Sequence, residues 1–233
     1  MRRFRLTFSK GEPVRYISHL DLMRTWERTL RRAAVKLAHS QGFNPRPRLV
    51  FAAPLPVGVT SDAEIVDVVV EDDGSAAEFV RRLEPALAPG MAVLAAREVP
   101  PEAPSVMASA LSADYIVLLE SPLQPERLEA FLASASVPYE RLRKGIAKPA
   151  DIRPAVLDLW PEEGGLGVRL RLDVEGQTVR PEEVVRALDP AARVVRVHRT
   201  ALQLKDEPVE RSEALTLPSP APTGEGPKAS HAA

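Results

Sequence analysis

The chain has 233 residues, of which 45% are hydrophobic and 27% charged, and its formal net charge is −1. This length provides for one large domain or two small ones. The absence of cysteine excludes disulfides, zinc–thiolate sites, cysteine nucleophiles and any iron–sulfur cluster held by this chain. With no apolar run long enough to span a membrane and no signal-peptide pattern at the N-terminus, we expect a cytoplasmic protein without a membrane partner.

The positive charge is concentrated at the N-terminus. Residues 1–48 contain twelve Lys or Arg and three Asp or Glu, so they carry +9 and the remainder of the chain carries −10. Such an asymmetry indicates an acidic partner for the basic segment.

The first hundred residues are predicted to alternate strands and helices. Alternation of apolar and polar residues or high β-propensity predicts strands at residues 2–10, 48–53, 64–71 and 91–99. A capping box, with Ser18 three residues before Asp21, predicts a helix from Ser18 to about residue 36. A second helix is predicted over residues 75–87, and the proline-rich residues 100–110 are predicted to be a linker.

The same order of elements recurs after the linker. Strands are predicted at residues 114–120, 153–160, 166–174 and 192–204, and proline-initiated helices at residues 125–135 and 181–188. The repeated βαββαβ order predicts an α+β fold of two tandem ferredoxin-like domains, 1–99 and 111–205. Residues 206–233 are rich in Pro, Ser, Ala and Glu and are predicted to be a disordered tail.

The first predicted helix has one apolar and one basic face. At 3.6 residues per turn, Leu22, Trp26 and Leu30 form an apolar stripe that should pack on the sheet. The opposite side carries four arginines: Arg24, Arg28, Arg31 and Arg32. Arginine binds phosphate in a bidentate manner, so this face suits a phosphate backbone or an acidic protein surface, although a plain solvated face is the alternative.

The connector after this helix adds candidate binding residues. Prolines and Gly42 indicate a defined path, Phe43 offers an aromatic face for stacking, and Asn44, Arg46 and Arg48 add polar groups. A structured turn that buries Phe43 is the competing interpretation. Ser61, Asp62 and Glu64 further on could accept hydrogen bonds from a base or a partner, or serve as caps.

The second half has its own basic segment, residues 139–154, predicted to be a loop or hairpin tip. Its candidate binding residues are Arg143, Lys144, Lys148 and Arg153. If this segment and the arginine helix faced one groove, they would form an electrostatic channel.

Three stretches together, residues 8–33, 40–64 and 148–154, resemble the radical-SAM-linked protein family, also called domain of unknown function 2344 (DUF2344). The resemblance covers roughly residues 2–200. It implies a bacterial protein with a separately encoded radical SAM partner. No cofactor is expected in this chain, because a chain without cysteine cannot hold the radical SAM cluster.

The candidates for catalysis are few. His19, at the start of the first helix, could act with His39 as a general acid–base pair that cleaves RNA without metal, but a histidine at a helix start is more often a capping or packing residue. No metal site is predicted.

The leading hypothesis is therefore a non-catalytic accessory protein of a radical SAM enzyme that binds RNA, such as tRNA or rRNA, through the arginine helix and the basic loop. The alternatives are a protein-interaction module that docks on the radical SAM partner without RNA, and a metal-independent RNA endonuclease that uses His19.

Overall fold

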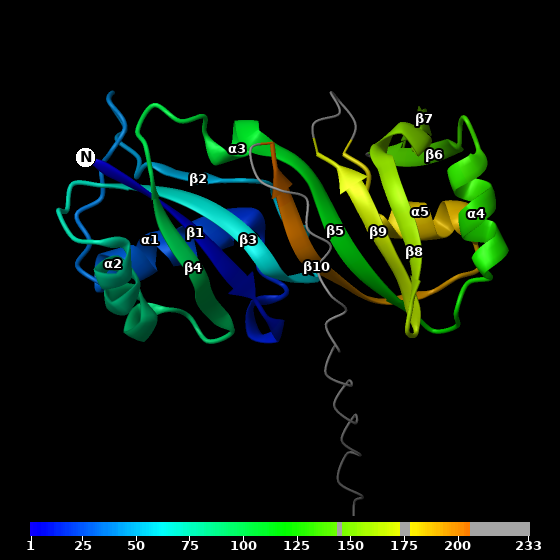
Figure 1. Cartoon of the computed structure of the whole chain (residues 1–233), viewed down its shortest axis with the longest axis horizontal. Helices are drawn as coiled ribbons and strands as arrows, with labels where there is room; N and C mark the ends of the chain where they lie inside the picture. Colours follow the sequence, from blue (N-terminus) through cyan, green and yellow to red (C-terminus); the bar gives the residue numbers. More distant parts are fainter. Residues whose placement is uncertain (144–145, 173–177, 206–233) are drawn as a thin grey trace, which may run out of the picture.

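The computed structural model describes residues 1–143, 146–172 and 178–205, and shows an α+β fold with a large sheet and few helices. The N-terminal half lies at the left of Figure 1 and the C-terminal half at the right. The strands of the N-terminal half are β1 (Arg2–Lys10), β2 (Leu49–Phe51), β3 (Val59–Val70) and β4 (Met91–Val99); its α-helices are α1 (His19–Arg32) and α2 (Ala76–Leu83).

The C-terminal half begins after a short helix, α3 (Val106–Ser109). Its strands are β5 (Ala110–Leu119), β6 (Pro138–Arg143), β7 (Ile146–Asp151), β8 (Val156–Glu162), β9 (Gly165–Arg171) and β10 (Val194–Leu204). Its helices are α4 (Pro125–Ala133) and α5 (Pro181–Leu188). β6 and β7 form a separate two-stranded hairpin.

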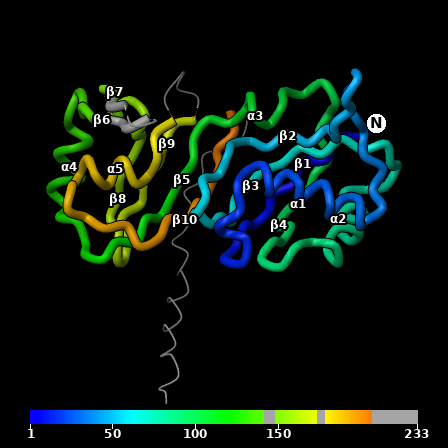
Figure 2. The backbone as a smooth tube through the Cα atoms, turned by 180° about the vertical axis from the view of Figure 1, so that it is seen from behind, coloured from blue at the N-terminus to red at the C-terminus, as the bar shows by residue number. Residues whose placement is uncertain are grey.

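One sheet runs through both halves, in the order β4-β1-β3-β10-β5-β9-β8, with β2 beside β3. The halves join where β10 pairs in parallel with β3, with His198 opposite Thr60. In Figure 1 α1 and α5 lie behind this sheet, and they lie in front in Figure 2, which shows the molecule from behind. Both helices therefore cover the same face of the sheet.

The N-terminal core lies between the sheet and α1. Phe4, Leu6 and Phe8, alternate residues of β1, are each at most 1% exposed and turn toward the helices. The Trp26 ring meets the Phe8 ring edge-on, with centroids 4.9 Å apart. This packing confirms the predicted apolar stripe of the first helix.

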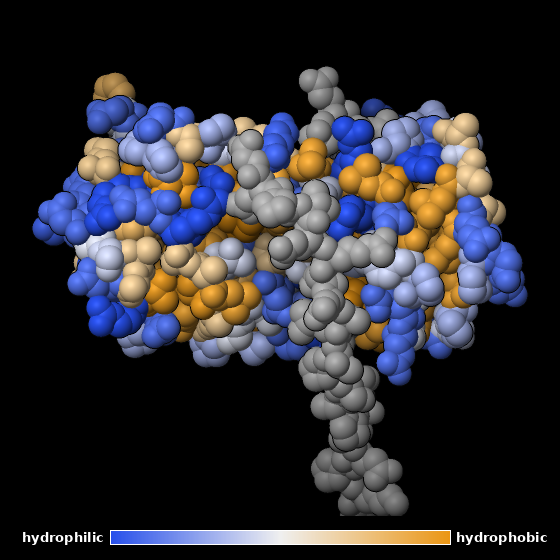
Figure 3. Space-filling model, viewed as in Figure 1, coloured by the Kyte–Doolittle hydropathy of each residue, from blue (hydrophilic) through white to orange (hydrophobic). Residues whose placement is uncertain are grey.

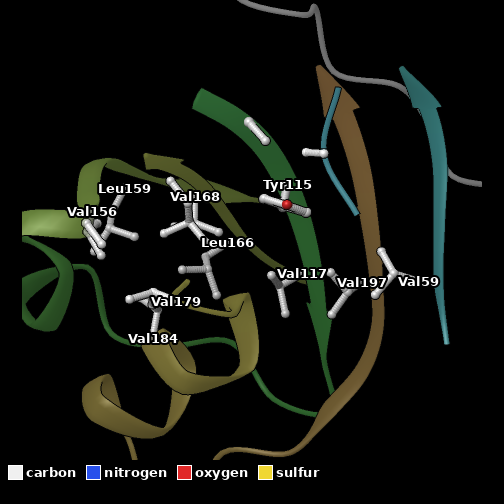
Figure 4. Close-up of a cluster of buried hydrophobic side chains, with 14 of the residues drawn as sticks. Val59, Tyr115, Val117, Val156, Leu159, Leu166, Val168, Val179, Val184 and Val197 are labelled. Carbon is white, nitrogen blue, oxygen red and sulfur yellow. The ribbon is translucent and has the colours of Figure 1, made fainter. Parts of the chain in front are cut away.

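The C-terminal core is built mainly on β5, β8, β9 and α5. Figure 4 shows Val117, Leu166 and Val184 among the side chains that fill the space between strands and helix. Val59 of β3 joins the same cluster, so this core reaches across the junction into the N-terminal half.

Most predicted elements are present, with corrections at several boundaries. The first helix ends at Arg32 rather than near residue 36, and β3 begins at Val59 rather than at residue 64. The predicted linker is not plain extended chain, because it contains α3 and its Val106 is fully buried. The N–H of Val106 donates to the Asp67 carboxylate at 3.2 Å, which ties this segment to β3.

The domain boundaries proposed from the sequence stay predictions, and the predicted tail lies outside the described residues. Within the part of the chain that the structure describes, no helix is both long and apolar enough to cross a membrane. Figure 3 shows the face turned away from α1, where hydrophobic residues (orange) reach the surface in both halves.

Candidate nucleic-acid interface

The arginine face, defined as Arg24, Arg28, Arg31 and Arg32 of α1, has a definite orientation because the start of the helix is capped. The Ser18 side chain accepts a hydrogen bond from the Asp21 N–H at 3.1 Å, as the capping pattern predicts. Helical periodicity then buries Leu22, Trp26 and Leu30 and leaves all four arginines exposed.

The four arginines differ in their local partners. Arg24 lies 3.3 Å from the Asp21 carboxylate, and Arg28 donates to the Thr25 hydroxyl at 3.0 Å; both contacts join exposed side chains of the same helix. Such contacts contribute little stability and are readily exchanged for a ligand. Arg32 instead donates to the Ala86 carbonyl at 2.6 Å, so it also links α1 to the segment after α2. The freest positive groups of the face are therefore Arg24, Arg28 and Arg31.

Hydrogen bonds from a side chain of α2 cap the C-terminus of α1 and fix the direction of the chain that follows. Arg82 donates to the carbonyls of Ala33 and Ala34, and at 2.8 Å to the Asp72 carboxylate. Ala34 has a positive φ of 52°, which turns the chain out of the helix. Since the capping group belongs to a residue 48 positions away, the local sequence around Ala34 did not reveal where the helix ends.

Residues 38–48 form a hairpin-like loop at the edge of β3, here called the 38–48 loop. The N–H of Arg48 donates to the Ala38 carbonyl at 2.9 Å, and the N–H of Ser40 donates to the Arg46 carbonyl at 2.9 Å. Gly42 at the tip has a φ of 131°, a conformation that favours glycine. In both Figure 1 and Figure 2 this loop projects from the upper edge of the N-terminal half.

Phe43 is fully exposed at the tip of the 38–48 loop, at 106% of its reference area. The interpretation that a turn buries this ring is therefore wrong. Asn44, Arg46 and Arg48 of the same loop are exposed as well. An exposed aromatic ring beside arginines is the combination that binds single-stranded nucleic acid, by base stacking and phosphate contact.

The basic residues of the C-terminal half do not join the arginine face. The β6–β7 hairpin lies at the end of the long axis away from α1 in both views, so the condition for a common channel, that both segments face one groove, is not met. Lys148 is exposed on β7, whereas the side chains of Arg143 and Lys144 lie outside the described residues. The Arg153 guanidinium already makes hydrogen bonds within the protein, because it donates to the carbonyls of Val156 and Leu132 at 2.7 and 2.9 Å.

Two of the three acceptors predicted around β3, Ser61 and Glu64, are turned inward instead. Glu64 is 2% exposed and pairs with Arg199 of β10 at 2.8 Å. Burial works against the charge of Arg199, but the Glu64 carboxylate and the Tyr115 oxygen outweigh it and raise the pKa of this guanidinium. Ser61 is fully buried, and Asp62 lies 3.3 Å from the His198 ring. Ser61 and Glu64 are therefore not available to a base, whereas the Asp62 side chain keeps 40% of its area exposed.

The two histidines considered for catalysis are not neighbours. His19 begins α1 and packs edge-on against Phe51, and burial lowers its pKa, while Glu64 acts in the opposite direction. His39 is exposed and follows the other end of α1. His39 follows Leu37, which pairs with Val70 of β3, whereas His19 packs against Phe51, which pairs with Val66. These positions are four residues, about 13 Å, apart along β3, so the proposed acid–base pair is not formed. The described residues contain no group of three or more His, Asp or Glu that could hold a metal ion.

Sequence reasoning missed a second arginine cluster, in an open cleft of about 790 Å³ between the halves. The cleft is lined by arginines from three segments, which are Arg15, Arg186, and Arg193 with Arg196, and also by Glu120 and Glu182. Glu12 pairs with both Arg15 and Arg196, which offsets part of this charge. No sequence signal could bring these residues together, since only the pairing of β10 with β3 does so.

Comparison with known proteins identifies the family of this chain. The model of the family described as "Uncharacterized protein conserved in bacteria (DUF2344)" matches residues 3–190. No curated protein matches the chain. A solved structure titled "Crystal Structure of a Cbf5-Nop10-Gar1 Complex" is similar, with a TM-score of 0.44 and 11% identity over 85% of this chain. This chain spans about half (48%) of that one.

Proposed function

Since the chain belongs to the DUF2344 family of uncharacterised bacterial proteins, we propose a function from its surface: it binds RNA through the arginine face and the 38–48 loop. The observation that carries this proposal is the joint exposure of Arg24, Arg28 and Arg31 with the Phe43 ring. Arginines bind phosphates without regard to sequence, while an exposed ring stacks on an unpaired base. RNA with unpaired loops, such as tRNA or rRNA, offers both.

The proposal treats this chain as an accessory protein rather than an enzyme. A separately encoded radical SAM partner, implied by the family resemblance, would supply the chemistry, and this chain would present the RNA. The two halves are proposed to be tandem ferredoxin-like domains. In support, the strand orders β4-β1-β3-β2 and β10-β5-β9-β8 follow the same pattern, with both helices of a half connecting its strands.

Salt dependence tests whether the arginine face contacts phosphates. Each lost phosphate contact lowers the slope of log K against log salt by about 0.7–0.9. Arg28→Ala should therefore weaken binding of total tRNA and flatten the salt dependence by about one contact, as measured by fluorescence anisotropy at several salt concentrations. Thermal stability should stay nearly unchanged, because Arg28 is exposed and its hydrogen bond within the described residues goes to Thr25 on its own helix.

The matched control for this experiment is Arg97→Ala on β4. Arg97 is opposite Arg5 in the register of β1 and β4, and Arg5 turns toward Asp67, away from the core under α1. Paired residues of neighbouring strands point to the same side, so Arg97 lies on the face away from the arginine face. A wild-type protein that does not bind RNA even at low salt would overturn the RNA proposal. Docking of the arginine face on an acidic protein surface would then be the remaining hypothesis.

Phe43 provides an independent prediction. Phe43→Ala should weaken RNA binding by about 1–3 kcal/mol, the usual value for one stacked base, without changing the melting temperature. Phe43→Tyr, which keeps an aromatic ring, should bind nearly as well as the wild type. Equal RNA affinity for the alanine and tyrosine variants would remove base stacking by Phe43 from the proposal.

A further inference from the structure

A second cavity, separate from the proposed RNA surface, lies at the junction of the two halves and has a volume of about 450 Å³. It is bounded by the segment after β2, by α3, by the start of α5 and by β5 and β10. Its lining includes Ala52, Leu55, Ala110 and Val179. This volume falls within the range of small-molecule pockets, and the walls are mainly apolar, as such pockets require.

The polar groups inside the cavity are already neutralised. Arg199, 1% exposed, donates to the Tyr115 oxygen at 2.8 Å and to the Pro54 carbonyl at 3.1 Å, and the Glu64 carboxylate balances its charge. A charged group placed deep in the cavity would therefore meet no unpaired opposite charge. An apolar group suits this interior better.

The rim, in contrast, carries two cationic side chains. Arg180 and Lys205 both line the cavity and both are exposed. No ion pair joins either side chain to a carboxylate among the residues that the structure describes. An anionic group at the mouth would meet both cations.

We propose that this cavity binds a small amphipathic anion, with an apolar ring system or chain inside and a carboxylate, sulfonate or phosphate at the Arg180–Lys205 rim. The proposal does not depend on RNA binding, because neither the arginine face nor Phe43 lines the cavity.

Two dyes of similar shape separate the apolar and anionic parts of the proposal. 8-Anilinonaphthalene-1-sulfonate carries a sulfonate, whereas N-phenyl-1-naphthylamine is the same ring system without it. Each would be titrated into the full chain and followed by fluorescence. Ala108→Trp and Met107→Trp change exposed positions of α3 that line the mouth of the cavity. Each should lower the affinity for both dyes by about tenfold or more, because the added indole covers apolar surface that the dye would otherwise bury.

Rim variants should separate the two dyes. Lys205→Gln and Arg180→Gln should each lower the affinity for the sulfonate dye by about two- to fivefold, since each removes one exposed positive charge. The affinity for the neutral dye should stay unchanged. Ala133→Trp, at the exposed end of α4, is the control for adding an indole elsewhere. The inference is overturned if both mouth variants bind both dyes as the wild type does. If the rim variants lost affinity for both dyes equally, the claim that an anionic group of the ligand binds at the rim would be refuted.

Discussion

Arg199→Met is expected to destabilise the protein by about 3–5 kcal/mol, because it leaves the buried Glu64 carboxylate without its partner. Arg199 and Glu64 are 1% and 2% exposed, so water cannot replace the lost guanidinium. Arg199 also binds the Pro54 carbonyl and the Tyr115 hydroxyl, and thereby holds β10, β5 and the N-terminal half together. Urea unfolding of the full chain measures the loss.

The double variant Arg199→Met, Glu64→Gln is the control for this interpretation. Replacing both members of a buried ion pair by uncharged groups is often far less costly than removing one. We therefore expect the double variant to be more stable than Arg199→Met alone. A single variant that loses less than about 1 kcal/mol, the value of an exposed pair, would show that Glu64 is not isolated from water.

Trp26→Ala is expected to cost about 3–5 kcal/mol, the usual range for deleting a large buried aromatic side chain. Trp26 is fully buried, and its ring packs on Phe8 of β1, so its removal opens a cavity between α1 and the sheet. The free energy of unfolding from urea titration gives the value.

Trp26→Phe tests the packing separately from the indole N–H. The indole nitrogen is buried without a hydrogen-bond partner among the described residues, so its removal should not add to the loss. The phenylalanine variant should therefore be clearly more stable than the alanine variant. If alanine cost less than about 1 kcal/mol, α1 would be rotated about its axis, and its arginines would not face outward together.

The start and orientation of α1 could be predicted because both depend on local features. Ser18 caps the helix through the nearby Asp21 N–H, and the 3.6-residue period then separates Trp26 from Arg28. The end of the helix could not be predicted in this way. Alanines at positions 33 and 34 favour a helix, and the contact that ends it comes from Arg82 of α2.

The junction was beyond sequence reasoning for a similar reason. Glu64 and Arg199 lie 135 residues apart, and only the parallel pairing of β3 with β10 brings them together. A carboxylate at the start of a predicted strand therefore suggested a surface acceptor, while the fold gives it a buried partner. Arg153 shows the same difficulty, since a basic residue in a predicted loop turns out to donate to two carbonyls.

The sequence left open whether the Phe43 ring is buried or exposed, and the structure shows that it is exposed. A glycine and two prolines around an aromatic ring suit both a buried turn and an exposed tip. The backbone bonds between Ala38 and Arg48 close the loop below the tip, and Phe43 stands free of the core. The ring is therefore available to a partner.

The most direct test of the central claim is the affinity of total tRNA for the triple variant Arg24→Gln, Arg28→Gln, Arg31→Gln, measured by fluorescence anisotropy at low salt. Glutamine keeps the length and polarity of the side chains, and the melting temperature verifies that α1 remains folded. We predict that the wild type binds tRNA with a strong salt dependence, that Arg97→Ala binds like the wild type, and that the triple variant loses most of its affinity and its salt slope. Unchanged affinity of a folded triple variant would contradict the claim that the arginine face of α1 binds RNA.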